Sequence, residues 1–284
     1  MAEGMHGKTV MVTGATDGIG LVTARELAAQ GARVLLVGRN GQKGRQAMAA
    51  IRERAAGADL AFHRADLSRL ADIRRLAQNV AESEPRLDVL VNNAGAIFDV
   101  RQETEDGFER TFALNHLNYF LLTDLLLEPL RAAPAARVVN VASRAHAGAE
   151  MPFHDLHLTE GYKAWRAYKQ SKLANILFTR ALAKRLESST VTANALHPGF
   201  VRTRFGGDNP TLFRMGVRLA MAAMAISVEE GAKTPIFLAS SPAVAGRSGG
   251  YYVKNAEARP DAAAADDAAA ERLWDMSRAM VGGR

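Results

Sequence analysis

The sequence predicts a single doubly wound α/β domain, in which seven parallel strands form a sheet with helices on both faces. Short β-branched or aliphatic runs alternate with longer amphipathic stretches almost from end to end, the pattern of βαβ units around a parallel sheet. The 284 residues are 48% hydrophobic and 23% charged, which is enough for a substantial core. No Pro/Gly/Ser-rich linker or internal repeat divides the chain, so residues 1–284 are expected to fold together.

Runs rich in Val, Leu, Ala and Thr indicate the strands. These runs are residues 9–13, 33–38, 60–65, 87–93, 136–143, 190–196 and 249–253. Amphipathic stretches between them predict helices at 18–31, 42–56, 69–83, 106–131, 161–187 and 228–239. Two further segments stand outside this alternation. Residues 204–227 are apolar and rich in methionine, which indicates a helical insert before the last βα unit, and the Ala-rich residues 260–280 predict a C-terminal surface helix.

Composition excludes several classes of function. The absence of cysteine excludes disulfides, thiolate metal sites and cysteine nucleophiles. Net charge is +6, but the arginines are interleaved with acids and alanines, so no nucleic-acid partner is expected. Apolar runs such as 219–226 are far shorter than a membrane span, and the first residues contain no apolar leader. We therefore expect a cytoplasmic protein without a membrane span, and scattered histidines at 146, 154 and 157 do not indicate a metal site.

A glycine-rich turn, "TGATDGIG" at residues 13–20, lies between the first strand and the first helix. Its glycines, Gly14, Gly18 and Gly20, would let backbone N–H groups and the positive end of the helix approach a pyrophosphate. Such a turn alone could be ordinary turn chemistry. Its position at the first βα junction favours dinucleotide binding.

Further polar residues follow the later strands. Asp66 comes after the third strand, "NNAG" at 92–95 after the fourth, and Ser143 closes the fifth. Parallel sheets of this kind bind cofactors at the carboxyl ends of their strands. These residues are therefore expected at one edge of the sheet.

The stretch "YKQSK" places Tyr168 and Lys172 four positions apart on a predicted helix. Residues at this spacing share a face, so the ammonium of Lys172 would lie beside the phenol. A neighbouring cation favours phenolate, which predicts a Tyr168 pKa below the ordinary value of about 10, closer to the range of an acid/base catalyst. The same pair also occurs on solvated helix faces, so it does not establish a site by itself.

In their order along the chain, these motifs resemble the short-chain dehydrogenase/reductase family from about residue 7 to residue 254. The matching features are TGxxxGIG, NNAG, a serine after the fifth strand, YxxxK and a Pro-Gly segment after the sixth. The chain is most similar to the retinol dehydrogenase-like subgroup, on the segments "LNHLNYFLLT" (114–123), "SRAHAG" (143–148), "HPGFVRT" (197–203) and "RLWDMS" (272–277). The resemblance implies a Rossmann-type dinucleotide-binding and catalytic domain.

Four catalytic residues are implied by this resemblance: Asn115, Ser143, Tyr168 and Lys172. Tyr168 would exchange a proton with the substrate oxygen, and Ser143 would orient that oxygen. Lys172 would tune the Tyr168 pKa and bind the nicotinamide ribose, while Asn115 would hold a water in a proton relay; hydride comes from the cofactor. Other roles stay open, since Ser143 could cap the strand end and Asn115 could satisfy helix backbone. Tyr162 is a competing phenol, but the residue four later is an arginine, outside the family pattern.

The resemblance also implies the cofactor contacts. Besides Tyr168 and Lys172, they are Gly14, Thr16, Asp17, Gly18, Ile19, Gly20, Arg39, Asp66, Leu67, Asn93, Ala94, Gly95, Pro198, Gly199, Val201 and Thr203.

The choice between NADP(H) and NAD(H) depends on the end of the second strand, "VGRN". Gly38 stands where an acid would hydrogen-bond a free ribose 2′-OH, and Arg39 offers a guanidinium to a 2′-phosphate. NADP(H) is therefore favoured over NAD(H). Asp17 argues the other way, because its charge could oppose the phosphate.

Together these features predict an NADP(H)-dependent oxidoreductase acting on a lipophilic aldehyde, ketone or alcohol. The lipophilic expectation rests on the insert 204–227, whose Phe205, Leu212, Phe213, Met215 and Leu219 could cover the nicotinamide or could equally pack on the core. A non-catalytic dinucleotide-binding sensor or scaffold is the alternative, although all four catalytic positions are present. The resemblance also allows a homodimer or homotetramer formed through helices 106–131 and 161–187.

Overall fold

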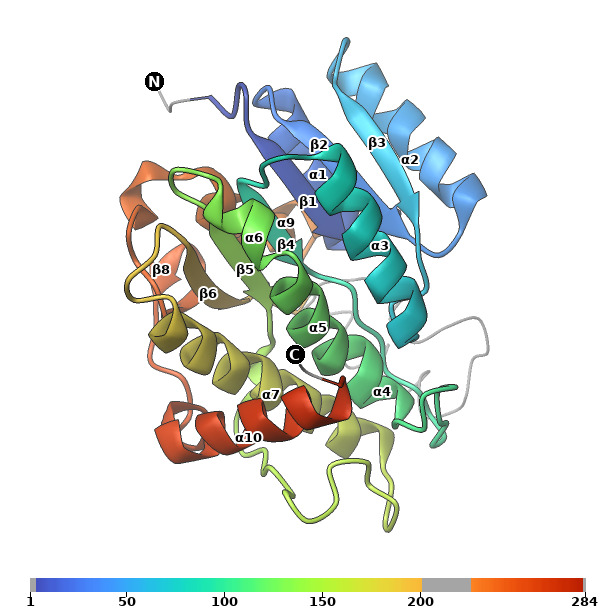
Figure 1. Cartoon of the computed structure of the whole chain (residues 1–284), viewed down its shortest axis with the longest axis vertical. Helices are drawn as coiled ribbons and strands as arrows, with labels where there is room; N and C mark the ends of the chain where they lie inside the picture. The colour runs from blue at the N-terminus through green and yellow to red at the C-terminus, as the bar shows by residue number, and fades with distance from the viewer. Residues whose placement is uncertain (1–3, 201–225, 283–284) are drawn as a thin grey trace.

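Eight strands form one sheet in the order β3-β2-β1-β4-β5-β6-β7-β8 (Figure 1). The computed structural model describes residues 4–200 and 226–282. The strands are β1 (Thr9–Thr13), β2 (Arg33–Gly38), β3 (Leu60–Arg64), β4 (Val89–Asn92), β5 (Arg137–Val141), β6 (Thr192–His197), β7 (Tyr251–Val253) and β8 (Ala256–Glu257). Strands β1 to β7 pair in parallel, and the order reverses at β1, which lies between β2 and β4. The predicted doubly wound sheet is confirmed.

The eighth strand was not expected from the sequence. Strand β8 pairs antiparallel with β7, with Tyr252 opposite Glu257. Lys254 and Asn255 connect the two strands with φ values of 50° and 63°. A two-residue turn with both central residues at positive φ closes a tight hairpin, and asparagine tolerates that conformation well. The seven-strand prediction missed this hairpin because β8 has only two residues.

Helices cover both faces of the sheet (Figure 1). They are α1 (Gly18–Ala29), α2 (Gly41–Arg54), α3 (Leu70–Ser83), α4 (Arg110–Phe112), α5 (Asn118–Leu125), α6 (Leu127–Arg131), α7 (Ala164–Arg185), α9 (Val228–Ser240) and α10 (Asp267–Met280). One core contains alternate strand residues such as Val10 and Val12 with α1, α2 and α9. The other contains Met11 and Leu90 with α3, α5, α7 and α10. This alternation is what a sheet buried on both faces requires.

The predicted helix 106–131 is divided into several pieces. The first piece, α4, begins at Arg110. The Glu109 carboxylate caps it by accepting hydrogen bonds from the backbone N–H groups of Thr111 and Phe112. A π-helical turn, Ala113–Leu117, follows α4, and a further break at Leu126 separates α5 from α6. Every residue in this stretch is compatible with an α-helix, so periodicity did not reveal the turn. Single π turns are frequent at functional sites, and this one carries Asn115.

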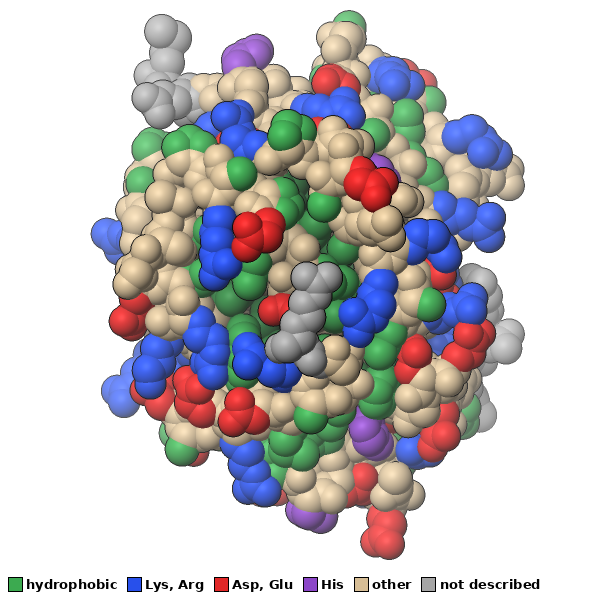
Figure 2. All heavy atoms as spheres, in the orientation of Figure 1, with side chains coloured by type: hydrophobic (Ala, Val, Ile, Leu, Met, Phe, Trp, Pro, Cys, Tyr) green, Lys and Arg blue, Asp and Glu red, His purple; other side chains and the backbone are tan. Residues whose placement is uncertain are grey.

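Of the two segments outside the predicted alternation, the structure describes the C-terminal one and only the end of the insert. Residues 204–225 lie outside the described residues, and so do the five apolar side chains that were expected to cover the nicotinamide or pack on the core. In the C-terminal segment, a short 3₁₀ turn at Ala262–Ala265 precedes α10. Leu273 and Trp274 of α10 are buried, and the Trp274 ring stacks on Phe178 of α7 at 5.9 Å. On the face of the molecule that carries α10, Figure 2 shows Lys and Arg side chains interspersed with Asp and Glu.

Candidate active site

The glycine-rich turn joins β1 to α1 in a conformation that needs its glycines. Gly14 and Gly18 have φ values of 65° and 55°, in the left-handed region that favours glycine. A Cβ at Gly20 would lie 2.3 Å from the carbonyl oxygen of Gly14, so the helix can approach the turn this closely only without a side chain. The first turn of α1 leaves backbone N–H groups without intrahelical partners, which suits an anionic ligand.

Asp17 occupies the N-cap of α1. Its Oδ1 accepts a hydrogen bond of 2.8 Å from the backbone N–H of Gly18, and the side chain is exposed. An N-cap carboxylate is stabilised by the positive end of the helix. The conflict with a cofactor phosphate that the sequence leads us to expect stays a prediction, and it would act through this exposed charge at the start of α1.

Thr13 connects the glycine-rich turn to the NNAG segment, a role that the sequence reading did not assign. Its Oγ1 donates to the Val91 carbonyl at 3.2 Å and accepts from the backbone N–H groups of Asn93 and Ala94 at 2.8 and 3.0 Å. Asn93 Nδ2 in turn donates to the Thr13 carbonyl at 2.8 Å. The first letter of "TGATDGIG" was the available signal, because a buried threonine at a strand end needs hydrogen-bond partners.

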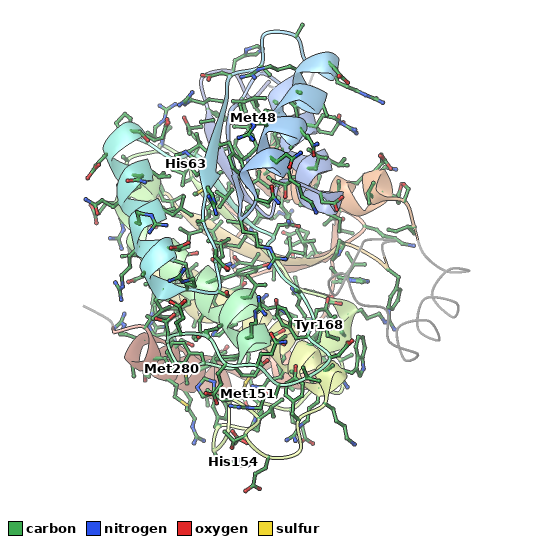
Figure 3. All side chains as sticks on the ribbon, turned by 90° about the vertical axis from the view of Figure 1, so that its right-hand side faces the viewer. Met48, His63, Met151, His154, Tyr168 and Met280 are labelled. Carbon is green, nitrogen blue, oxygen red and sulfur yellow. The ribbon has the colours of Figure 1, made fainter. Side chains whose placement is uncertain are left out.

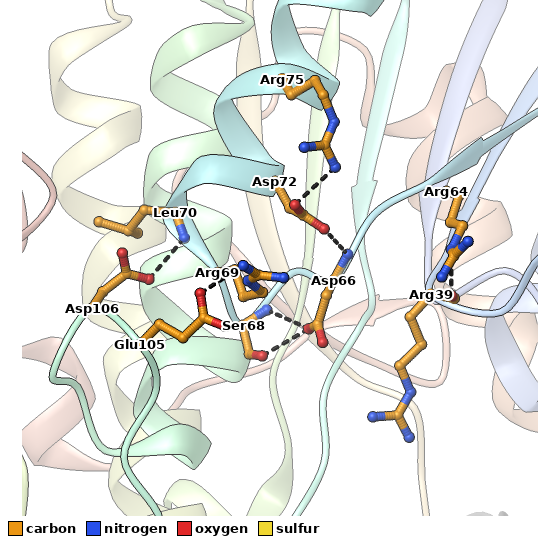
Figure 4. A network of polar contacts seen from close by, with 10 residues as sticks. All are labelled: Arg39, Arg64, Asp66, Ser68, Arg69, Leu70, Asp72, Arg75, Glu105 and Asp106. Atoms are coloured by element: carbon orange, nitrogen blue, oxygen red, sulfur yellow. Dashed lines mark hydrogen bonds and ion pairs between the residues drawn. The ribbon is translucent and has the colours of Figure 1, made fainter.

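The ends of β2 and β3 present two guanidinium groups (Figure 4). Arg39 is exposed and makes no side-chain hydrogen bond or ion pair among the described residues, while Arg64 Nε donates to the Arg39 carbonyl at 3.3 Å. A Cβ at Gly38 would lie 2.7 Å from Thr16 Cγ2, so the Thr16 side chain occupies the space beside Gly38. Residue 38 offers no carboxylate, and the neighbouring Arg39 guanidinium has no ion-pair partner among the described residues.

Asp66 is engaged in the turn that begins α3. Its Oδ1 accepts from the backbone N–H of Ser68 at 3.0 Å and from Ser68 Oγ at 2.7 Å (Figure 4). The Asp66 backbone N–H donates to Asp72 Oδ2 at 2.9 Å. Leu67 is buried, with 4% of its surface exposed. The network fixes the backbone at the end of β3 beside the cofactor side of the sheet.

Tyr168 and Ser143 meet where β5 ends against α7. Tyr168 is 9% exposed, and Figure 3 places it inside the domain, whereas His154 lies at the periphery. Ser143 Oγ accepts from the Ala145 backbone N–H at 3.1 Å and so caps the 3₁₀ turn Arg144–His146, as one of the open readings allowed. Burial raises the Tyr168 pKa to about 12, against a smaller lowering by a hydrogen bond with Ser143.

The expected lowering of the Tyr168 pKa is therefore wrong for the protein alone. The reason is burial of the phenol itself. Burial acts on Lys172 as well and lowers the pKa of its ammonium to about 7. Its Nζ lies 5.7 Å from the centre of the Tyr168 ring. A low-dielectric site favours the neutral forms of both groups, so the phenol stays protonated near neutral pH.

Lys172 Nζ points to the end of β5. It donates to the Val141 carbonyl at 2.9 Å, and the side chain is almost fully buried. A Cβ at Gly95 would lie 3.6 Å from this nitrogen and 3.1 Å from Asn115 Oδ1. Gly95, Asn115 and Lys172 thus line one small space, as the motif order predicted.

Asn115 projects from the π turn toward the loop after β4. Its Nδ2 donates to the Ala96 carbonyl and to Ser171 Oγ, both at 2.9 Å, and its Oδ1 accepts from the Ala96 backbone N–H at 2.8 Å. Both amide hydrogens are therefore used by the protein. Ser171, which also donates to the Tyr168 carbonyl at 2.8 Å, was missed by the sequence reading. Asn115 braces the backbone of the NNAG loop rather than that of its own helix.

The Pro-Gly segment directly follows β6 and lies beside the turn that Ser143 caps. Gly199 has a φ of 96°, and a Cβ there would lie 2.4 Å from Ile226 Cδ1. His197 Nδ1 accepts from the Arg144 backbone N–H at 3.1 Å, which joins this segment to the Ser143 turn. Pro198 is half-buried. Val201 and Thr203, both expected cofactor contacts, lie outside the described residues.

The competing phenol lies elsewhere. Tyr162 donates to the Phe98 carbonyl at 2.7 Å and so braces a loop. Within residues 4–200 and 226–282, no group of histidine and acidic side chains could hold a metal ion. In the same residues, no helix combines the length and apolar character needed to cross a membrane.

Comparison with known proteins decides the family. Residues 8–211 match the family described as short chain dehydrogenase. The chain belongs to this family. Retinol dehydrogenase 14 of Mus musculus is 44% identical over 98% of this chain and 87% of its own, and retinol dehydrogenase 12 of Homo sapiens is 41% identical over the same shares. This short-chain dehydrogenase is thus retinol dehydrogenase-like, in a family of oxidoreductases that bind a nicotinamide dinucleotide.

Solved structures agree with the fold. An uncharacterised protein from Mycobacterium paratuberculosis superposes with a TM-score of 0.80 at 32% identity, covering 100% of this chain and 96% of its own. The RhlG/NADP active-site complex of Pseudomonas aeruginosa has a TM-score of 0.70 at 29% identity, covering 88% of this chain and 95% of its own. Both likenesses agree with the α/β fold of the described residues.

Proposed function

We propose that the protein transfers a hydride between NADP(H) and a lipophilic carbonyl or alcohol. The observation that carries this proposal is the convergence of Tyr168, Ser143 and Lys172 at the end of β5, beside Gly95 and the Asn115 amide. The glycine-rich turn and the first turn of α1 fit a pyrophosphate, because Gly14, Gly18 and Gly20 carry no side chains and the first turn of the helix leaves backbone N–H groups free, although the Asp17 carboxylate caps that of Gly18. The bound cofactor supplies the hydride.

The protein's own residues would handle the proton. With a pKa of about 12, Tyr168 is protonated at neutral pH and can donate to a carbonyl oxygen during reduction. Ser143 Oγ, which is hydrogen-bonded to the phenol, would also hydrogen-bond the substrate oxygen and so orient it. Lys172 would bind ribose hydroxyls from its position beside Gly95. Asn115 would keep the NNAG loop in place, and the free lone pair on its Oδ1 is the side-chain position left for a relay water.

Preference for NADP(H) is supported by Gly38 and Arg39. No acid at residue 38 would meet a ribose 2′-OH, and the exposed Arg39 guanidinium has no acidic partner among the described residues. The relative from Pseudomonas aeruginosa is described with NADP in its active site. Asp17 opposes this preference through its negative charge.

A lipophilic substrate is supported by an exposed aromatic side chain beside Tyr168 and by a second one that follows the Pro-Gly segment. Trp165 is 47% exposed, and its ring centre lies 5.6 Å from that of Tyr168. Phe200, after the Pro-Gly segment, is 40% exposed. The relatives named retinol dehydrogenases point to a lipophilic alcohol as well. Large apolar side chains exposed beside a catalytic group commonly form a binding surface.

The test compares Tyr168→Phe with Tyr162→Phe, using NADPH oxidation and a homologous series of straight-chain aldehydes. Loss of a general acid should lower kcat by about 10² to 10⁴-fold in Tyr168→Phe, with NADPH affinity retained. Tyr162→Phe should remain active, because its hydroxyl contacts the Phe98 carbonyl, Thr111 and Glu109, none of which is assigned to catalysis. Catalytic efficiency should rise with chain length.

Three results would count against the proposal. Full activity of Tyr168→Phe would remove the proton donor assigned here. Flat or falling efficiency with chain length would exclude the lipophilic substrate. Tight NADPH binding by the wild type without turnover of any carbonyl or alcohol would favour the non-catalytic sensor or scaffold instead.

A further inference from the structure

His116 is a buried histidine next to Asn115 in the π turn, and the proposed chemistry does not use it. Its Nε2 lies 2.8 Å from Ser277 Oγ of α10, across 161 positions of sequence. Neither side chain is exposed to solvent. A buried hydrogen bond of this kind constrains both elements, because breaking it would leave polar atoms without water.

The other side of the imidazole faces Asn175 on α7. Burial lowers the His116 pKa to about 3, and the Asn175 side chain partly opposes that shift. His116 Nδ1 and Asn175 Oδ1 are both buried, and neither has a partner at close hydrogen-bonding distance among the described residues. A neutral ring with its hydrogen on Nδ1 would direct that hydrogen toward Asn175, and Nε2 then accepts from the Ser277 hydroxyl.

Asn175 continues the connection to the catalytic lysine. Its Nδ2 donates to the Val141 carbonyl at 3.3 Å, the same oxygen that accepts from Lys172 Nζ at 2.9 Å. We call the sequence Ser277, His116, Asn175 and the Val141 carbonyl the His116 network. It reaches Lys172 through a shared acceptor and Asn115 through the adjacent backbone.

Aromatic packing holds the histidine ring in this position. Its centre lies 4.9 Å from that of Phe112 and 6.1 Å from that of Phe178. Phe178 in turn stacks on Trp274, one turn before Ser277 on α10. The ring therefore has little freedom to rotate away from Ser277 and Asn175.

We propose that His116 is a positioning residue through which α10 fixes the π turn and the end of β5, and with them Asn115 and Lys172. The inference rests on the proposed function, since the residues it positions are the ones assigned to catalysis there. It makes the C-terminal helix part of the apparatus for turnover in addition to its packing on α7. Removing the Ser277 hydroxyl should then disturb catalysis more than binding.

The sharpest test compares Ser277→Val with Ser277→Thr. The two side chains add the same methyl group in nearly the same shape and differ only in the hydroxyl. We expect kcat to fall about tenfold in Ser277→Val and much less in Ser277→Thr, with little change in KM for the aldehyde, because displaced catalytic groups affect the transition state most. Ser277→Ala, which adds no volume, should behave like Ser277→Val.

Two further variants separate positioning from general loosening of α10. Asp267→Asn removes an ion pair between α10 and Arg180 of α7 without touching the His116 network, so its kcat should match the wild type even if Tm falls slightly. His116→Gln, which can both donate and accept, should keep more activity than His116→Leu. Equal kcat for Ser277→Val and Ser277→Thr would overturn the inference.

A readout independent of turnover distinguishes this inference from the proposed function. Backbone amides of residues 113–117 should exchange hydrogen faster in Ser277→Val than in Ser277→Thr, because the π turn loses its tether. Unchanged exchange overturns the positioning role whether or not the enzyme assay succeeds. An active wild type that Tyr168→Phe inactivates, with Ser277→Val indistinguishable from Ser277→Thr, would leave the proposed function standing and remove only this inference.

Discussion

Replacing Arg39 by alanine should weaken NADPH binding selectively. Arg39 is exposed, is unpaired among the described residues, and follows a glycine that offers no carboxylate to a ribose. A hydrogen bond to a charged group contributes about 1.5 to 3 kcal/mol, and solvent screening places an exposed guanidinium near the lower end. About 1.5 kcal/mol corresponds to about a tenfold rise in Kd for NADPH. NADH lacks the phosphate, so its Kd should change less than about twofold by the same arithmetic.

Fluorescence titrations of the wild type and Arg39→Ala with both cofactors measure this difference. Arg54→Ala is the matched control, because Arg54 is also exposed and lies at the far end of α2. Raising the salt concentration should narrow the wild-type preference, since the contact is screened. Equal weakening of NADPH and NADH, or an unmutated protein that binds both equally, would refute the role of Arg39 in selecting the phosphate.

Three more predictions follow from the same geometry. Asp17→Asn should keep the cap of α1 and lower the Kd for NADPH, because asparagine caps a helix as effectively as aspartate but carries no charge. An unchanged Kd would contradict the expected repulsion between Asp17 and the phosphate. Thr13→Val should lower the free energy of unfolding in urea by about 1 to 3 kcal/mol, since two N–H groups lose their acceptor; an unchanged midpoint would show that the two segments need no such link. Stability should fall with acid, because unfolded His116 gains a proton below about pH 6.5, whereas the folded residue, with a pKa of about 3, stays neutral until lower pH. Between pH 6.5 and 5 the wild type should therefore lose about 1.6 kcal/mol of unfolding free energy that His116→Gln keeps, and an unaltered slope in the variant would place the titration elsewhere.

The fold could be predicted from the sequence because its signals are periodic and local. Strands β1 and β2 match the predicted runs residue for residue, since each is a largely apolar stretch that ends at a glycine-containing turn. The π turn could not be predicted in this way. It depends on where Glu109 starts the helix and on the contacts that Asn115 and His116 make with distant loops and helices.

The long-range contacts of the site show the same limit. Motif order indicated that Gly95, Asn115 and Lys172 belong to one site, and the structure brings them together. Nothing in their spacing indicated that Thr13 holds two segments or that Ser277 reaches the π turn. Such partners are ordinary polar residues in sequence, and only burial reveals that their hydrogen bonds are obligatory.

The pKa of Tyr168 illustrates why pair spacing predicts partners better than it predicts chemistry. The four-residue interval correctly places Lys172 near the phenol, at 5.7 Å from the ring centre. It carries no information on how deeply both groups are buried. Burial moves the Tyr168 pKa up to about 12 and the Lys172 pKa down to about 7, so each shift removes charge from the pair. A lysine that is only partly charged stabilises a phenolate weakly, and the two effects therefore reinforce each other. Under the proposed function, oxidation of an alcohol would need Tyr168 as a base and would then depend on charge brought by bound ligands, whereas reduction could begin from the protonated phenol that the protein provides by itself.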